Sequence, residues 1–166
     1  MDSPSSNIRI ATLADLDELV RLESVFPTDH MSRGSFRRLL RRGRADILVY
    51  DEGQGVWGNA VLLYRRGSAG ARLYSLVVHP GHRGRGIAHA LLSAAEQAAL
   101  ARGCTRLTLE VRCDNEKALA LYRSRGYLPV RRMEDYYEDR APALRMSKQF
   151  VAPPGTAAPL PRKAGL

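Results

Sequence analysis

The chain has little cysteine and no long apolar run, and each shortage excludes a class of protein. Its 166 residues include two cysteines, Cys104 and Cys113, which are too few for a disulfide framework or a cysteine metal cluster. This usage is typical of a reducing compartment, so we expect a cytoplasmic protein. No apolar stretch approaches the roughly 20 residues that span a bilayer. The N-terminal MDSPSSN also lacks the basic and apolar regions of a secretory signal. We therefore expect no membrane partner and no metal.

Lysine is scarce too, because almost all of the 26 basic residues are arginines, against 17 acidic residues. The net charge of +9 and the planar guanidinium groups suit bidentate contacts with phosphate or carboxylate, which indicates an anionic partner. A genome whose codon bias favours arginine for solvated cations would give the same composition. The position of each arginine in the fold decides between these explanations.

The composition is that of one folded domain. Hydrophobic residues make up 45% and charged residues 26% of the chain, which excludes a rod and a largely disordered chain. A chain of this length buries a core without metals or disulfides. We place the domain at residues 7–150, after a flexible leader over 1–6 and before a tail rich in proline and alanine over 151–166.

Hydrophobic periodicity predicts an α/β domain. Alternating apolar residues predict strands at residues 8–11, 47–50, 56–64, 71–78, 105–111, 127–130 and 143–147. Helical spacing predicts helices at residues 12–26, 32–42, 87–102 and 115–124. Thr12 with Asp15 forms a weak capping box, and Ser32 is a helix cap. An antiparallel first half and a strand–helix–strand crossover in the second imply one twisted mixed β-sheet with flanking helices.

A glycine-rich loop, HPGHRGRG at residues 79–86, joins a predicted strand to a predicted helix. Gly84 and Gly86 let backbone N–H groups approach an oxyanion, and the helix N-terminus adds the positive end of its dipole. Such a loop suits a pyrophosphate. It lacks the lysine and hydroxyl residue of a Walker loop and the acidic residue of a Rossmann fingerprint. A turn that carries surface arginines is the alternative.

The string RGRGIA at residues 83–88 matches R/Q-x-x-G-x-G/A, and here the chain resembles the GNAT superfamily of N-acetyltransferases. The flanking strings LYSLVVHP, LTLEVRCDNEKALALYRSRGY and DYYEDRAPALRM are similar to the ribosomal-protein alanine N-acetyltransferase branch. The resemblance runs from about residue 71 to 148. It implies the GNAT fold, in which a central pair of strands splays apart, and acetyl-CoA as cosubstrate.

The resemblance also implies which residues hold acetyl-CoA. In the family, freed backbone amides of the splayed strand bind the pantetheine arm and the thioester carbonyl, and the matching positions are Leu76, Val77 and Val78. The positions that match pyrophosphate contacts are Arg83, Gly84, Arg85, Gly86, Ile87, Ala88 and His89. Asn115 matches a residue that hydrogen-bonds CoA, although an ordinary helix N-cap also explains an asparagine there.

Amine acetylation requires a base for the attacking nitrogen, donors for an oxyanion and an acid for the departing thiolate. Glu110 is the only carboxylate within strand 105–111 and matches the general base of the resembling branch. Tyr122 matches the proton donor, since a phenol can protonate a thiolate of similar strength. A solvated glutamate and a core tyrosine are the competing interpretations.

The acceptor side of the resemblance is weaker. Tyr136 and Tyr137 match a pair that shapes the acceptor cleft, or they form an aromatic edge of the sheet. EDRAPA follows them where the family often has an acidic, glycine-bearing segment, and FPTDHMSRGSF lacks the family's tryptophan. The resemblance implies a protein or peptide amino terminus as acceptor, and these departures leave a small-molecule amine open.

Other candidates are of a different class. His79 and His82 have no third metal ligand, and Cys113 has no catalytic partner at a recognisable spacing, which favours an inert thiol. A non-catalytic CoA sensor or nucleic-acid binder would use the arginines of the second predicted helix and the arginine two residues beyond its end. These are Arg37, Arg38, Arg41, Arg42 and Arg44. A solvated helix face explains them better, so nucleic acid is not favoured as a partner, and we expect a monomer or homodimer.

Overall fold

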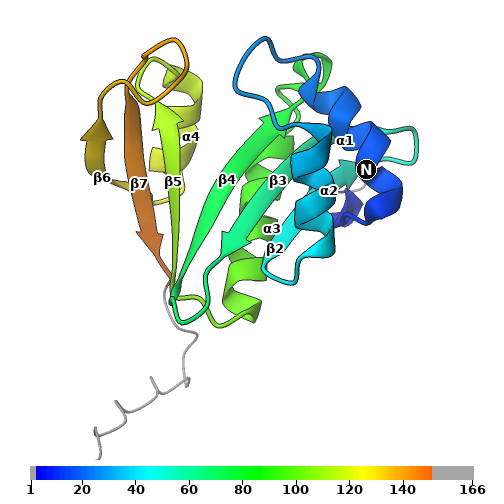
Figure 1. Ribbon diagram of the computed structural model, residues 1–166, viewed down its shortest axis with the longest axis horizontal. Helices are drawn as coiled ribbons and strands as arrows, with labels where there is room; N and C mark the ends of the chain where they lie inside the picture. Colours follow the sequence, from blue (N-terminus) through cyan, green and yellow to red (C-terminus); the bar gives the residue numbers. More distant parts are fainter. Residues whose placement is uncertain (1–2, 151–166) are drawn as a thin grey trace, which may run out of the picture.

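A seven-stranded mixed sheet with the strand order β1-β2-β3-β4-β5-β7-β6 forms the centre of the computed structural model, which describes residues 3–150 (Figure 1). The strands are β1 (Ile8–Ile10), β2 (Ala45–Asp51), β3 (Val56–Tyr64), β4 (Gly70–Val78), β5 (Arg106–Arg112), β6 (Leu128–Met133) and β7 (Ala143–Gln149). The α-helices are α1 (Leu16–Glu23), α2 (Arg33–Arg41), α3 (Ile87–Ala101) and α4 (Glu116–Ser124), and the short 3-10 helices are η1 (Pro4–Asn7), η2 (Leu13–Asp15) and η3 (Pro80–His82).

The predicted fold class and element order are confirmed, with differences at the ends. The helix predicted over 12–26 is divided into η2 and α1 and ends at Glu23. The leader predicted over 1–6 contains η1, because Pro4 at its start fixes a helical turn. The predicted tail over 151–166 lies outside the described residues.

The sheet separates two hydrophobic cores. On one face α3 and α4 pack over the strands, with Leu91, Leu107 and Tyr127 among the buried side chains. On the other face α1 and α2 cover β2 and β3, with Leu19 and Phe36 buried (Figure 1). Alternate residues of the central strands point into the two cores. Because α1 and α2 cover only β2 and β3, the face of β4 and β5 opposite α3 has no covering helix.

Strands β4 and β5 pair in parallel only from Gly70↔Arg106 to Leu73↔Leu109 and then separate (Figure 1). Beyond that fork β4 stays paired with β3, whereas β5 pairs with β7. The pairing of β3 with β4 skips one residue at Tyr74, which is typical of a β-bulge. The predicted splayed pair is therefore present, and from Tyr74 to Val78 one backbone edge of β4 faces a gap.

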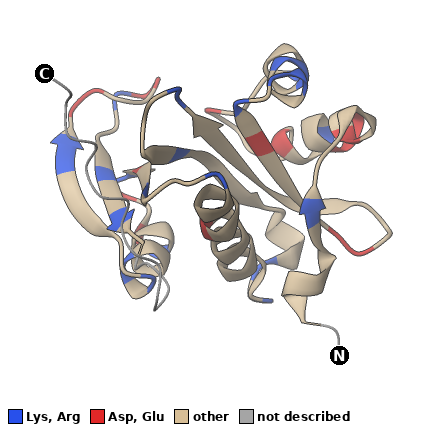
Figure 2. Ribbon diagram, turned by 90° about the horizontal axis from the view of Figure 1, so that it is seen from below, with Lys and Arg blue, Asp and Glu red and all other residues tan. Residues whose placement is uncertain are grey.

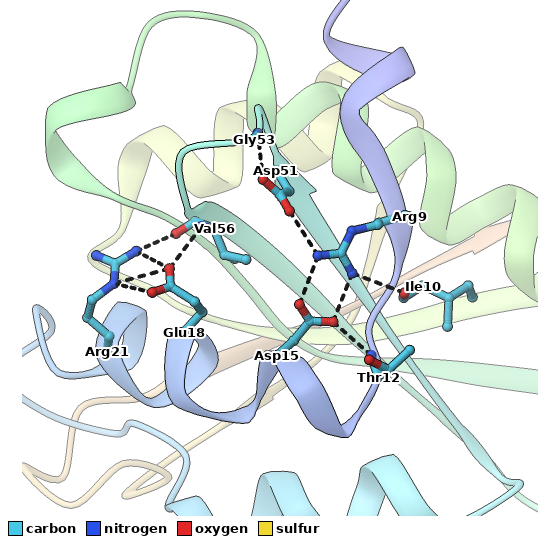
Figure 3. A network of polar contacts seen from close by, with 9 residues as sticks. All are labelled: Arg9, Ile10, Thr12, Asp15, Glu18, Arg21, Asp51, Gly53 and Val56. Carbon is cyan, nitrogen blue, oxygen red and sulfur yellow. Dashed lines mark hydrogen bonds and ion pairs between the residues drawn. The ribbon is translucent and has the colours of Figure 1, made fainter.

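A polar network fastens α1 to the strands beside it (Figure 3). Arg9 donates two hydrogen bonds of 2.8 Å to Asp15 and one of 2.9 Å to Asp51. Asp15 accepts from the backbone N–H of Thr12 at 2.8 Å, which confirms the predicted capping box. Arg9 also lowers the pKa of the Asp15 carboxyl group by its hydrogen bonds. These contacts fix the N-terminus of α1 against β1 and β2.

A second network joins α3 to the half of the sheet that contains β7. Lys148 Nζ lies 3.1 Å from both oxygens of Glu96, and the Tyr127 hydroxyl donates to the same carboxylate at 3.1 Å. The side chains of Lys148 and Glu96 are 25% and 11% exposed. This ion pair therefore joins α3 to β7 beside the apolar core that the two halves of the sheet share.

Lys148→Met is expected to lower the free energy of unfolding by about 2 kcal/mol, because it removes the nearer of two cations beside a nearly buried carboxylate, the other being Arg125 at 3.5 Å. The melting temperature should fall by roughly 4–8 °C in a protein of this size. Arg132→Met is the control: Arg132 pairs with Glu134 at the surface, where both side chains are more than half exposed, and it should leave the melting temperature unchanged. Equal effects of the two variants in a thermal melt would contradict this role of Glu96.

Candidate functional site

A cleft of about 650 Å³ opens along the unpaired edge of β4. It lies between the glycine-rich loop before α3 and the first turns of α4. Its lining residues are Phe26, Leu76, Val77, Val78, His82, Arg83, Gly84, Gly86, Ile87, Ala88, His89, Asn115, Lys117, Ala118, Leu121 and Tyr122. The structure thus brings together the predicted strand, loop and helix residues, with Arg85 missing from the lining.

The loop presents a helix N-terminus to this cleft. Gly84 and Gly86 have φ angles of +79° and +78°, and Gly86 caps α3 in the left-handed conformation. A side chain in that conformation is strained, which explains glycine at both positions. The first N–H groups of α3 have no acceptor within the helix. A Cβ at either glycine would meet no atom within 4 Å, so both open toward free space where an oxyanion could lie.

Arg85, one of the positions that match pyrophosphate contacts of the family, is not among the residues that line the cleft. Its guanidinium forms an ion pair with Glu52 and lies 2.9 Å from His82 Nδ1. The neighbouring Arg83 is exposed and lines the cleft. Because Glu52 lies beyond the end of β2, no local pattern pointed to this pairing, and only the backbone of Arg85 stays a candidate.

Aromatic rings hold the loop in place. Trp57 stacks on His82 with ring centroids 4.1 Å apart, and His79 meets Trp57 edge to face at 5.5 Å. His79 Nδ1 accepts a hydrogen bond from the N–H of Gly81 at 3.0 Å. The histidines therefore position the loop. No group of three or more His, Cys, Asp or Glu side chains within residues 3–150 is arranged to hold a metal.

Helix α4 forms the opposite wall of the cleft. Asn115 Oδ1 accepts from the N–H of Ala118 at 3.1 Å, which confirms the N-cap interpretation, and the same residue lines the cleft. Ala118, Leu121 and Tyr122 share one face of the helix through the spacings i, i+3 and i+4. Because Tyr122 is a predicted site residue, this spacing could have pointed to Ala118 and Leu121, which the sequence analysis missed. It also missed Phe26 and Lys117, for which no local pattern exists.

Tyr122 is 7% exposed and its ring packs edge to face against Tyr127 at 5.7 Å. Burial raises the pKa of Tyr122 well above its usual value, so the phenol keeps its proton. None of the described residues hydrogen-bonds its hydroxyl. The residue is therefore both part of the core, as the competing interpretation had it, and a protonated group at the cleft wall.

Glu110 follows the last pair of β4 and β5 and lies at the fork, on the face opposite Tyr122. Its side chain is 5% exposed, so the interpretation as a solvated glutamate is wrong. Arg72 Nε lies 3.0 Å from one carboxylate oxygen, and Arg145 Nη2 lies 2.9 Å from the other. Each oxygen is paired with one arginine and keeps a second lone pair, at which the carboxylate could accept a proton from an incoming amine.

The tyrosine pair lies in the loop between β6 and β7, beside the fork. Tyr136 accepts a hydrogen bond from Arg72 Nη2 at 3.1 Å, which connects it to Glu110. The Tyr137 ring lies 4.9 Å from the guanidinium of Arg112. Burial, with a smaller effect of Tyr136, raises the pKa of Tyr137 to about 12. The pair therefore stands at the gap and not on an outer edge of the sheet.

Comparison with known proteins agrees with this geometry. Residues 13–127, more than half of the chain, match the acetyltransferase (GNAT) family. The chain belongs to this family. It is similar in fold to the ribosomal-protein-S18-alanine N-acetyltransferase from Escherichia coli, with a TM-score of 0.79 and 24% identity over 91% of this chain and 98% of that one.

Curated relatives match parts of the GNAT domain. An acetyltransferase from Sodalis glossinidius is 48% identical over 82 residues, which are 49% of this chain and 57% of that protein. An N-alpha-acetyltransferase from Arabidopsis thaliana is 40% identical over 78 residues, which are 47% of this chain and 41% of that protein. The chain therefore matches about half the length of these relatives. No helix within residues 3–150 is long and apolar enough to cross a membrane.

Proposed function

We propose that this protein is an N-acetyltransferase that transfers the acetyl group of acetyl-CoA to a primary amine. The observation that carries the proposal is the cleft, which runs from a helix N-terminus along the unpaired edge of β4 to the buried phenol of Tyr122. Membership in the GNAT family supports the same reaction class.

The position of the cleft residues supports the contacts with acetyl-CoA that the family resemblance implies. The N–H groups of the loop and of the first turn of α3, with Arg83, would hold the pyrophosphate. The backbone from Leu76 to Val78 would hold the pantetheine arm and the thioester carbonyl, because its N–H groups on the gap side have no strand partner. Asn115 lines the cleft on the side of α4. Its Oδ1 caps that helix, and its side chain would hydrogen-bond CoA.

Direct attack accounts for the placement of the two proton-transfer groups on opposite faces of the sheet. The amine nitrogen forms a bond to the thioester carbon, and the bond from that carbon to sulfur breaks. The N–H groups of β4 stabilise the oxyanion. Glu110 accepts the proton that nitrogen loses, and Tyr122 gives its proton to the departing thiolate.

The proposed acceptor is the amino terminus of a protein or peptide. The Escherichia coli and Arabidopsis relatives, whose names refer to acetylation of an alanine in a ribosomal protein and of α-amino groups, support this choice. An α-amino group has a pKa of about 8, compared with about 10.4 for lysine. It therefore loses its proton to a modest base more readily.

A panel of acceptors tests this choice. Short peptides with a free amino terminus should release CoA, and the same peptides with a blocked terminus should not, when CoA is followed at low enzyme concentration. Polyamines, aminoglycosides and free amino acids form the comparison set. Turnover confined to these small amines would contradict a peptide acceptor while leaving the acetyltransferase proposal intact.

A further inference from the structure

A second hollow of about 540 Å³ lies at the closed end of the fork, on the uncovered face of the sheet. We name it the arginine recess after the four arginines in its lining, which are Arg65, Arg72, Arg106 and Arg145. Glu110 is the one carboxylate among its lining residues, all of which belong to the described part of the chain. The recess therefore begins at the group proposed to receive the proton of the amine.

We propose that the acceptor is an acidic peptide, whose side-chain carboxylates bind the arginine recess while its amino terminus lies at Glu110. This inference rests on the proposed function and names the acceptor class that the same site selects. It goes beyond that function because acetylation of a primary amine by itself assigns no ligand to the four guanidinium groups.

The strand registers place the recess residues on one face. Arg106 and Glu110 alternate along β5 with Leu107, Leu109 and Val111, which are buried against α3. Glu110 pairs with Arg145 of β7, and the residue two positions before Glu110 pairs with Arg72 of β4. Side chains of paired residues project to the same face of a sheet. The arginines thus gather from four neighbouring segments around one hollow.

The charges in the recess are unbalanced. Arg72 and Arg145 share Glu110, whereas Arg65 and Arg106 make no ion pair with any residue of the described range 3–150. Four guanidinium groups against one carboxylate leave an excess of three positive charges in a concave site. Clefts lined by one sign of charge concentrate the field and attract ligands of the opposite sign.

A glycine allows one of these arginines to approach the sheet closely. A Cβ at Gly70 would lie 2.9 Å from Arg106 Nε, so the guanidinium lies directly over the backbone of β4. A side chain at that position would require the guanidinium to shift. The absence of a Cβ at Gly70 therefore lets Arg106 lie against the sheet, at the floor of the recess.

The length of the recess fits a peptide. Arg106 and Glu110 are four residues apart on β5, which is roughly 13 Å at the rise of a strand. An extended peptide covers that length with about four residues, so the carboxylates should lie within the first five residues of the acceptor. A carboxylate that pairs with Arg72 or Arg145 would share that arginine with Glu110, which places the bound peptide beside the group proposed to accept the proton.

The test uses hexapeptides with the same free N-terminal alanine and with Asp and Glu, or Asn and Gln, or Lys at positions two to five. The full chain should acetylate the acidic peptide with a kcat/KM about 10- to 100-fold above that of the amide peptide. Arg106→Gln should reduce this preference about tenfold, with KM for acetyl-CoA unchanged. Arg66→Gln is the matched control, because Arg66 is a neighbouring exposed arginine outside the recess.

Binding of the acetylated products separates this inference from the proposed function. N-acetylated acidic peptide should bind in a calorimeter in the presence of CoA, and Arg106→Gln should weaken that binding. This result would support the recess even if no acceptor is turned over. A lack of turnover with every acceptor would contradict the acetyltransferase proposal. Equal turnover of acidic and amide peptides would overturn the recess alone. A preference for amino sugar phosphates or amino dicarboxylates over acidic peptides would overturn the peptide as the source of the negative charge.

Discussion

Replacing Gly84 or Gly86 with aspartate is expected to abolish the stabilisation of this protein by acetyl-CoA. The new carboxylate would stand in the open space beside the first turn of α3, where the pyrophosphate is proposed to bind, and like charges repel. A ligand at 100 times its Kd stabilises the folded state by about 2.7 kcal/mol. For a chain of this size, that is a rise in melting temperature of roughly 5–10 °C, which a thermal shift assay measures with and without acetyl-CoA.

Backbone strain has to be separated from ligand repulsion in this experiment. Both glycines have a positive φ, so aspartate there lowers stability by about 1–2 kcal/mol even without ligand. Gly67→Asp is the matched control: its φ is +73°, a Cβ there meets no atom within 4 Å, and it lies outside the cleft. This variant should melt lower and keep its full response to acetyl-CoA. A full response in both loop variants would remove the loop from the proposed site.

The parts of the molecule that local chemistry determines could be predicted from the sequence. Caps at Thr12, Ser32 and Asn115 are present as expected, because each depends on residues at most three positions away. The glycine loop and the first turn of α3 follow the same rule. Alternation also placed each strand to within a few residues, since the two faces of the sheet bury different cores.

The pairing of charges could not be predicted, because it depends on the order of the strands. Glu110 meets Arg72 and Arg145, which are 38 and 35 positions away in the chain. These contacts exist because β7 lies between β5 and β6 and because β4 runs parallel to β5. The pairing of Arg85 with Glu52 is of the same kind. A sequence with so many arginines offers no local rule for choosing among partners.

Position also separates the two explanations for the basic composition. Helix α2 carries basic residues and no acidic ones, whereas α1 carries both signs (Figure 2). The arginines from Arg37 to Arg44 are exposed, as expected for a solvated face. Those of the recess surround a hollow beside Glu110. The excess charge is therefore of two kinds, and only the second has a geometry suited to selecting a ligand.

Substitution of the two groups proposed to transfer protons should give the largest losses of rate. Glu110→Gln and Tyr122→Phe should each lower kcat by about 10²- to 10⁴-fold with acetyl-CoA affinity nearly unchanged. Tyr127→Phe is the control for the phenol, because Tyr127 packs against Tyr122, bonds Glu96 and lies outside the cleft lining. It should reduce stability without changing kcat. Acetyl-CoA binding by each variant, measured by thermal shift, shows that the fold is retained.

The pH dependence distinguishes chemistry from packing. The deficit of Glu110→Gln should shrink as pH rises through about 8, because more of the α-amino acceptor is then already deprotonated. Burial raises the pKa of Tyr122 above its usual value near 10. The phenol therefore stays protonated through pH 10, and the wild-type rate should show no alkaline decline below that pH. A decline near pH 9 that disappears in Tyr122→Phe would contradict the raised pKa. Wild-type rates in both variants with a good acceptor would leave positioning of the amine as the source of catalysis.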